Sequence, residues 1–75
     1  MLSPSEATGS RIRHLLKKSG HTQQEFGEAI GVAQQGVSKR LIGQIPFDVN
    51  ELVAAARFLD VPLSDLIPAD TKASA

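Results

Sequence analysis

The chain contains no cysteine, tryptophan or tyrosine. Without thiols it has no disulfide framework and no thiolate for a metal ion, which fits a reducing compartment. No apolar run approaches about 18 residues, and no basic and then apolar leader opens the chain, so we expect neither a membrane span nor a signal peptide. These absences favour a soluble cytoplasmic protein.

An excess of charge of either sign is also lacking, because eight Lys and Arg residues balance eight Asp and Glu residues. A neutral chain argues at first against a polyanionic partner, but the charges are unevenly distributed. From residue 46 onward two basic residues meet five acidic ones, a net charge of −3. Residues 10–45 have a net charge of +4, from Glu25 and Glu28 and six basic residues: Arg11, Arg13, Lys17, Lys18, Lys39 and Arg40. The positive field therefore belongs to residues 10–45.

Residues 22–43 predict two short helices joined by a tight turn. Thr22 and Glu25 have the spacing of a capping box, and apolar residues then follow at helical intervals. Gly31 stands at the C′ position, so the first helix should end at Ile30. We expect the second helix from Gln34 to about Leu41.

The second helix should separate its side chains into two sets, given about 100° of rotation per residue. Ala33, Val37 and Leu41 fall on one side. The opposite side has two amides, a hydroxyl and an ammonium group and no carboxylate: Gln34, Gln35, Ser38 and Lys39. Such groups suit base edges, since Gln pairs with adenine and Lys donates to guanine or phosphate. The alternative interpretation of these four residues is an ordinary solvated helix face.

Helices are also expected on both sides of this pair. Ser3, Pro4 and Glu6 predict a first helix from about Pro4 to Ser19, and a later start because of Gly9 is the alternative. Asp48 and Glu51 form another capping box before a helix from about Val49 to Leu59. A short fifth helix should follow Pro62 and stop before Pro68. With 75 residues, 41% of them hydrophobic, we expect one small all-α domain over residues 1–68 and a flexible C-terminal tail over 69–75.

These residues resemble the helix-turn-helix domains of phage Cro proteins and repressors, the XRE class. The resemblance covers roughly residues 12–67 and rests on Thr22, Gln23, Phe26, Gly31, Val32, Val37, Ser38, Gly43, Leu52, Leu59, Val61 and Leu66. It implies a five-helix bundle of the phage-repressor type, encoded by a bacterium or phage. It also implies a recognition helix with base contacts from Gln34, Gln35, Ser38 and Lys39. Gln23 would touch DNA, and the loop near Gly43 and Gln44 would offer backbone amides to phosphate.

Several positions depart from the family pattern. Gly27 and Gly36 lie inside helices, where each costs up to about 1 kcal/mol relative to Ala, and Ala33 is a poor N-cap. Many members pair an arginine of the first helix with a glutamate of the recognition helix. Leu16 and Leu41 stand at those positions, which is compatible with an apolar contact. Arg40 replaces an aliphatic residue, and we expect its guanidinium to reach toward a phosphate.

The remaining basic and titratable residues have weaker interpretations. Arg11, Arg13 and Lys17 are candidate phosphate contacts, although a solvated face is the more ordinary role. His14 and His21 are seven residues apart with no HExxH pattern, so we expect surface histidines and no metal site. No Ser/His/Asp arrangement and no phosphate-cradling glycine pattern is present, so we expect no catalysis, no cofactor and no small-molecule ligand.

The sequence therefore predicts a sequence-specific regulator of transcription that binds a double-stranded DNA operator, either a repressor or a Cro-like protein. The alternative is a protein-interaction adaptor on the same fold, as in antitoxins. A weak homodimer through Leu63, Leu66 and Ile67 is a further expectation, but the same residues would serve equally to close the core.

Overall fold

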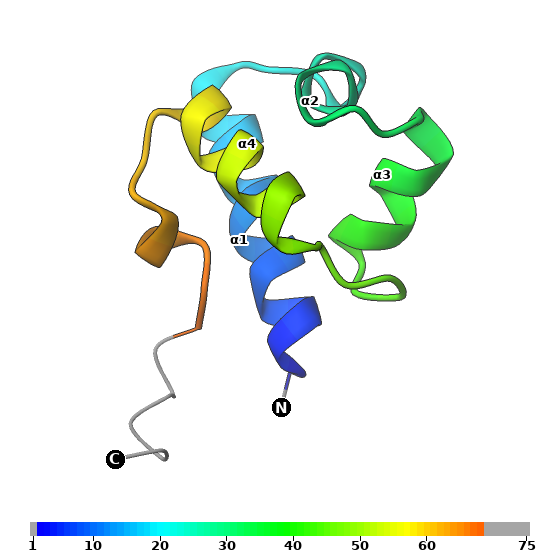
Figure 1. The fold of residues 1–75 in the computed structure, drawn as a ribbon, viewed down its shortest axis with the longest axis vertical. Helices are drawn as coiled ribbons and strands as arrows, with labels where there is room; N and C mark the ends of the chain where they lie inside the picture. The colour runs from blue at the N-terminus through cyan, green and yellow to red at the C-terminus, as the bar shows by residue number, and fades with distance from the viewer. Residues whose placement is uncertain (1, 69–75) are drawn as a thin grey trace.

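The computed structural model describes residues 2–68, which form four α-helices and one 3₁₀ turn (Figure 1). The α-helices are α1 (Pro4–Ser19), α2 (Gln23–Ile30), α3 (Gln34–Leu41) and α4 (Val49–Leu59), as the sequence predicts. The prediction of a fifth helix was wrong, because the chain forms only the three-residue 3₁₀ turn η1 (Leu63–Asp65) in this region. Pro62 and Pro68 leave too few residues between them for a stable α-helix. The expected tail over 69–75 lies outside the described residues.

Side chains cap three of the four helices. In α1 the Ser3 N–H donates to Glu6 Oε1 (2.8 Å) and the Glu6 N–H donates to Ser3 Oγ (3.1 Å). Equivalent reciprocal pairs join Thr22 to Glu25 and Asp48 to Glu51. These capping boxes explain why the starts of α1, α2 and α4 could be predicted from the sequence. The predicted start at Pro4 is confirmed, and the alternative of a later start because of Gly9 is not.

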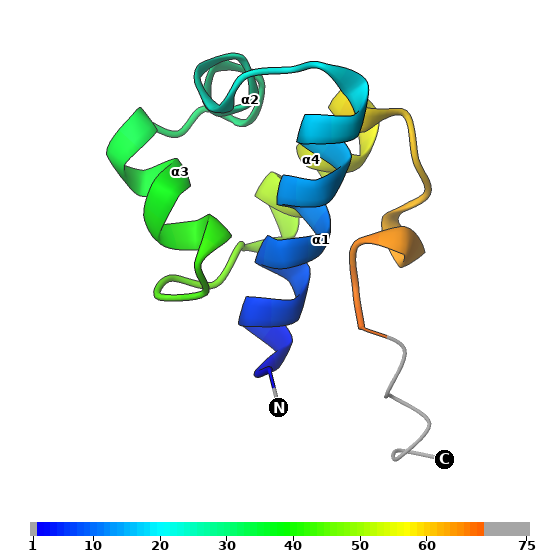
Figure 2. The same ribbon diagram turned by 180° about the vertical axis from the view of Figure 1, so that it is seen from behind.

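The helix α1 is central to the fold. Figures 1 and 2 show α3 and the η1 turn on opposite sides of α1 and α4, with α2 across one end. A single core occupies the space between these elements, made of Ile12, Leu16, Phe26, Val37, Leu41, Ala55, Ala56 and Leu66. The rings of Phe47 and Phe58 each lie 6.1 Å from that of Phe26. This arrangement leaves the outer side of α3 uncovered.

Leu16 and Leu41 are both buried in this core, with exposed fractions of 3% and 2%. The resemblance implies an ion pair at these two positions in many family members, and in this chain both side chains are apolar and buried. Leu66 is also buried, with an exposed fraction of 1%. Of the residues expected at a dimer contact, Leu66 therefore closes the core of its own chain.

Gly9 allows α1 to approach the end of α3 very closely. A Cβ atom at this position would lie 2.3 Å from the backbone oxygen of Leu41 and 2.8 Å from that of Arg40. Backbone atoms cannot yield as the tip of a flexible side chain can. The position of α3 against α1 therefore depends on the absence of a side chain here.

Gly9→Ala should lower the free energy of unfolding by about 2 kcal/mol or more, because the added methyl group forces the two helices apart. Ser10→Ala, at the exposed neighbouring position, should change it by less than about 0.5 kcal/mol. Urea denaturation of both variants provides the measurement. A gain in stability for Gly9→Ala, as in an unhindered helix interior, would contradict the close approach.

Candidate nucleic-acid interface

The turn between α2 and α3 is held by local hydrogen bonds and by the core. After Ile30, Gly31 takes the left-handed conformation (φ 78°), and the Val32 N–H donates to the Gly27 oxygen at 2.9 Å. Phe26 of α2 and Val37 of α3 are completely buried. The angle between the two helices is therefore set by packing on both sides of the turn.

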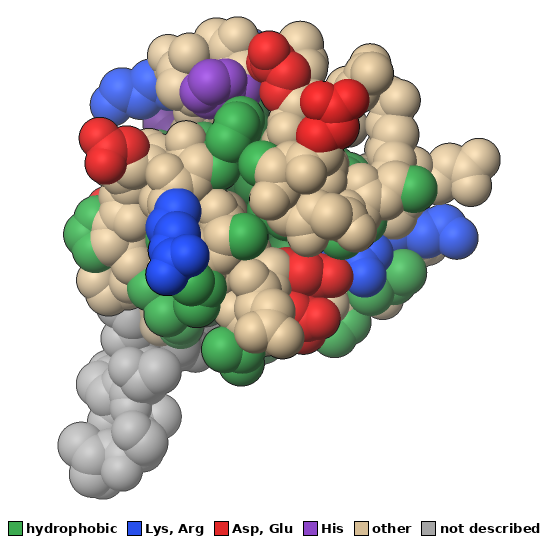
Figure 3. Space-filling model, turned by 45° about the horizontal axis from the view of Figure 1, so that its top comes forward, with side chains coloured by type: hydrophobic (Ala, Val, Ile, Leu, Met, Phe, Trp, Pro, Cys, Tyr) green, Lys and Arg blue, Asp and Glu red, His purple; other side chains and the backbone are tan. Residues whose placement is uncertain are grey.

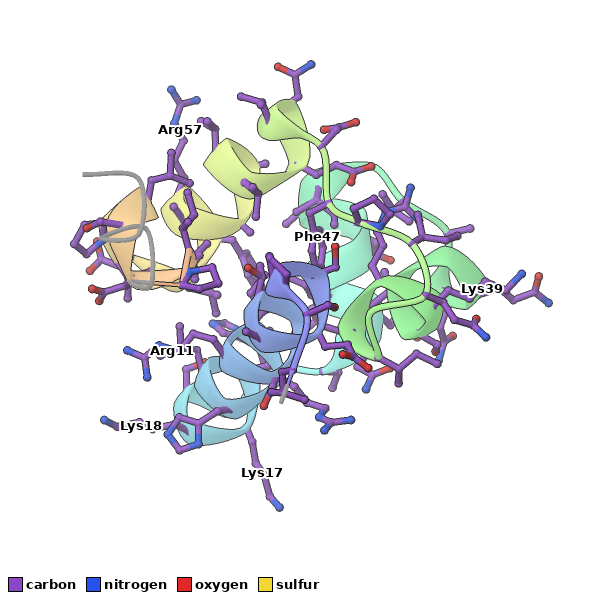
Figure 4. All side chains as sticks on the ribbon, turned by 90° about the horizontal axis from the view of Figure 1, so that it is seen from below. Arg11, Lys17, Lys18, Lys39, Phe47 and Arg57 are labelled. Carbon is purple, nitrogen blue, oxygen red and sulfur yellow. The ribbon has the colours of Figure 1, made fainter. Side chains whose placement is uncertain are left out.

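The polar face of α3 is exposed as the sequence predicts. Gln34, Gln35, Ser38 and Lys39 are all exposed, whereas Val37 and Leu41 of the same helix are buried. Figure 4 shows Lys39 projecting from α3 away from the body of the protein. The structure thus places two amides, a hydroxyl and an ammonium group on one outward surface without a carboxylate on that helix. We call these four residues the α3 face.

Gln23 lies at the first position of α2, next to the Thr22 cap, and is half-buried. The Thr22 N–H donates to Glu25 Oε1 at 2.8 Å, and this bond is the main reason why the pKa of Glu25 is lowered. His21 Nδ1 lies 3.6 Å from the same oxygen and lowers that pKa further. Because the pKa of the folded state is the lower one, the carboxylate stabilises α2 above its unfolded pKa and loses that effect as the pH falls.

The basic residues of α1 do not form one surface. Arg11 Nε donates to the Asp65 backbone oxygen at 3.1 Å, and its guanidinium lies 4.0 Å from the Asp65 carboxylate. Figure 4 shows Arg11 and Lys39 on opposite sides of the molecule, with Lys17 pointing in a third direction. Arg13 and Lys17 are exposed. Of the three expected phosphate contacts on α1, Arg11 is thus turned toward the C-terminal segment.

The backbone amides of Gly43 and Gln44 are already used inside the protein. The Gly43 N–H donates to the Arg40 oxygen at 3.2 Å, and the Gln44 N–H donates to the Lys39 oxygen at 2.9 Å. These bonds close the turn after α3. Of these two residues, Gln44 has an exposed side chain that remains available for contacts.

Arg40 does not point outward, although the sequence predicts that its guanidinium reaches toward a phosphate. Its Nε donates to Glu51 Oε1 at 3.0 Å, and one terminal nitrogen donates to the Gly36 oxygen at 3.1 Å. Sequence reasoning missed this pair. The available signal was an arginine at a normally aliphatic position, four residues after a glycine in the same helix.

The two histidines have ordinary environments. His14 is exposed, and the half-buried ring of His21 packs on Phe58 with a centroid distance of 4.4 Å. Within residues 2–68 no three His, Asp or Glu side chains gather as a metal site would require. In the same part of the chain, no helix combines the length and the apolar character needed to cross a bilayer.

The surface charge is mixed. Figure 3, which brings the end of the molecule near α2 forward, shows acidic and basic side chains interspersed on that side, without a broad basic surface. On this side of the molecule, the electrostatic attraction for a polyanion should therefore be modest.

Known structures share this fold. The restriction-modification controller protein C.AhdI from Aeromonas hydrophila superposes with a TM-score of 0.76 at 23% identity, over 81% of this chain and 92% of that one. The clp gene regulator ClgR from C. glutamicum superposes with a TM-score of 0.81 at 23% identity, over 88% of this chain and 86% of that one. No match is found among curated protein sequences.

A model of the helix-turn-helix family matches residues 12–66, from the middle of α1 to the residue after η1. The match includes α2, the turn and all of α3. Together with the observed geometry of α2 and α3, it shows that the chain belongs to the XRE class of helix-turn-helix DNA-binding regulators.

Proposed function

We propose that this protein binds a specific double-stranded DNA operator by seating α3 in the major groove. The observation that carries the proposal is the α3 face: four hydrogen-bonding side chains point outward from a helix whose other side is anchored in the core. An α-helix fits the major groove, where each base pair presents a distinct pattern of donors and acceptors. In this role Gln34 and Gln35 pair with adenine, and Lys39 and Ser38 donate to guanine or to phosphate.

Phosphate contacts would set the register of α3 on the duplex. Gln23 at the start of α2, the side chain of Gln44, and Arg13 and Lys17 of α1 are the candidates that the structure leaves available. Such contacts contribute affinity on any sequence, whereas the α3 face discriminates between bases. The protein would regulate transcription by occupying the operator, because a bound protein excludes competitors from the same site. It would act as a repressor or as a Cro-like protein.

A protein-interaction adaptor is the second candidate function. It is favoured by the zero net charge of the chain and by the engagement of Arg11 and Arg40 within the protein. A gel shift against random duplex at low and at moderate salt distinguishes the two functions. Salt-sensitive retention supports DNA binding, and no retention at either salt concentration supports the adaptor.

We also propose a weak homodimer, revised from the sequence expectation. Leu63 and Ile67 are exposed at 37% and 43%, whereas Leu66 is buried. Leu63 borders a groove at the end of α4 that is also lined by Arg57 and Asp60. Because a twofold axis pairs each patch with itself, Arg57 of one copy would meet Asp60 of the other beside an apolar centre.

Gln34→Ala and Gln35→Ala should each weaken binding to the preferred site by about 1 to 3 kcal/mol and leave binding to random duplex nearly unchanged. The preferred site is first selected from a pool of random duplexes, and affinities are then measured by fluorescence anisotropy. Asn50→Ala, which removes an exposed amide from α4, is the matched control and should have no effect. Equal losses on both kinds of DNA would show that the glutamines do not read bases.

Lys17→Ala should weaken binding to specific and random duplex alike and reduce the slope of log affinity against log salt by about 0.9, because one phosphate contact is lost. Arg13→Ala should behave in the same way. Lys18→Ala removes the same charge from an exposed side chain on the side of Arg11, away from Lys39 (Figure 4), and should leave the slope unchanged. If all three variants have the wild-type slope, α1 does not contact the DNA backbone.

Leu63→Lys should abolish the rise of apparent mass with protein concentration in sedimentation experiments, because it buries a charge in the proposed contact. Val49→Lys is the matched control at the start of α4, where Val49 is 72% exposed, and it should sediment as the wild type does. A wild-type protein that stays monomeric at all concentrations, both free and on selected DNA, would exclude the dimer.

A further inference from the structure

We propose that Arg40 and Glu51 form a clamp between α3 and α4 that positions the α3 face for DNA, so that Arg40 acts as a positioning residue and not as a phosphate ligand. This inference rests on the proposed DNA binding. It assigns a role to an ion pair whose two side chains are not part of the α3 face.

The contacts of Arg40 hold its guanidinium inside the protein. Nε lies 3.0 Å from Glu51 Oε1, and a terminal nitrogen lies 3.1 Å from the Gly36 oxygen. The side chains of Arg40 and Glu51 are only 18% and 12% exposed. Water therefore screens this pair much less than it screens the Arg11 and Asp65 pair, whose side chains are 45% and 43% exposed. Turning Arg40 outward would leave Glu51 with a poorly solvated, unpaired charge.

Glu51 connects the pair to the start of α4. Its Oε1 atom accepts from the Asp48 N–H at 3.0 Å as well as from Arg40 Nε, and its own N–H donates to Asp48 Oδ1 at 2.7 Å. One carboxylate oxygen thus serves the capping box of α4 and the last turn of α3. The capping box fixes the rotamer of Glu51, so Arg40 docks on a carboxylate that is already in place.

Gly36 gives the guanidinium access to the helix backbone. A Cβ atom at this position would lie 2.9 Å from a terminal nitrogen of Arg40 and 2.8 Å from a methyl carbon of Val32. A side chain here would displace the guanidinium from the Gly36 oxygen. The glycine that weakens α3 as an isolated helix therefore makes room for a contact that holds α3 in place.

The clamp closes the segment that follows the recognition helix. Residues 42–48 connect α3 to α4, and the turn at their start is held by the bond from the Gln44 N–H to the Lys39 oxygen. At its other end α3 has no side-chain cap, because Ala33 provides none. A helix of eight residues with one uncapped end needs tertiary contacts to keep a single orientation. The clamp supplies one at the end opposite the uncapped N-terminus.

The clamp and a direct phosphate contact predict opposite effects of one substitution. Glu51→Gln keeps an acceptor for the capping box but removes the charge that holds Arg40. If Arg40 were a phosphate ligand, this change would release it toward DNA, remove a nearby negative charge and raise affinity. If Arg40 positions α3, the same change loosens the helix and lowers affinity for the preferred site.

Binding of Arg40→Met and Glu51→Gln to the selected duplex and to random duplex tests the clamp, at a temperature where circular dichroism shows each variant to be folded. Arg40→Met should lower affinity for the selected site about tenfold, and Glu51→Gln about threefold. Both should keep the wild-type salt slope, affect random duplex less, and combine with less than additive loss in the double variant. Lys18→Met and Glu28→Gln make the same charge changes at exposed positions and should not lower affinity.

Hydrogen exchange of the Gln44 amide provides a measurement without DNA, and this amide should exchange faster in both clamp variants than in their controls. Arg40→Lys, which keeps the charge but not the two-point contact, replaces Arg40→Met if that variant does not fold and should bind with intermediate affinity. Tighter binding by Glu51→Gln, a slope reduced by about 0.9 in the Arg40 variant, or unchanged affinity in both would overturn the clamp. Failure of the wild-type protein to retain any duplex would instead overturn the proposed function.

Discussion

Burial of the inner side of α3 is the interaction on which the rest of this structure depends. The helix has eight residues, an internal glycine and no side-chain cap, and such a segment is not stable alone in water. Val37 and Leu41 anchor it in the core, and Gly9 brings α1 against its last turn. The outward direction of the four polar side chains follows from this packing. The proposed DNA-binding surface is therefore a product of the core behind it.

The structure also divides the basic residues into two groups that composition cannot separate. Arg11 and Arg40 are paired with Asp65 and Glu51, whereas Arg13, Lys17 and Lys39 remain exposed. The positive charge available to DNA is therefore smaller than the net charge of residues 10–45 suggests. Under the proposed function we expect weak binding to random DNA, and a preference for one site would have to come from base contacts, from precise positioning of α3 or from a second copy.

Much of the fold could be predicted because its signals are local. The capping boxes at Thr22 and Asp48 each involve residues only three positions apart, and so the starts of α2 and α4 could be located in the sequence. The exposed α3 face follows in the same way from helical periodicity. The prediction of a fifth helix was wrong because the segment between Pro62 and Pro68 is too short for a stable α-helix.

Other features were not indicated by capping patterns or periodicity. The amides of Gly43 and Gln44 were expected to face phosphate, but they donate to the nearby oxygens of Arg40 and Lys39 and complete the turn after α3. Leu66 was a candidate for either a dimer contact or the core, and the structure places it in the core. The burial of Leu66 could not be read from neighbouring residues, because it depends on packing against parts of the chain that are distant in sequence.

Local patterns in the sequence locate the four α-helices, the polar side of α3 and the family that the chain resembles, since caps and periodicity act over a few residues. Tertiary structure alone decided which arginines are free, why Gly9 and Gly36 are glycines, and how α3 is held against α1 and α4. The physical reason is that close approach and ion pairing depend on distances in space. Arg40 and Glu51 are 11 positions apart in the chain, yet their charged atoms are separated by 3.0 Å.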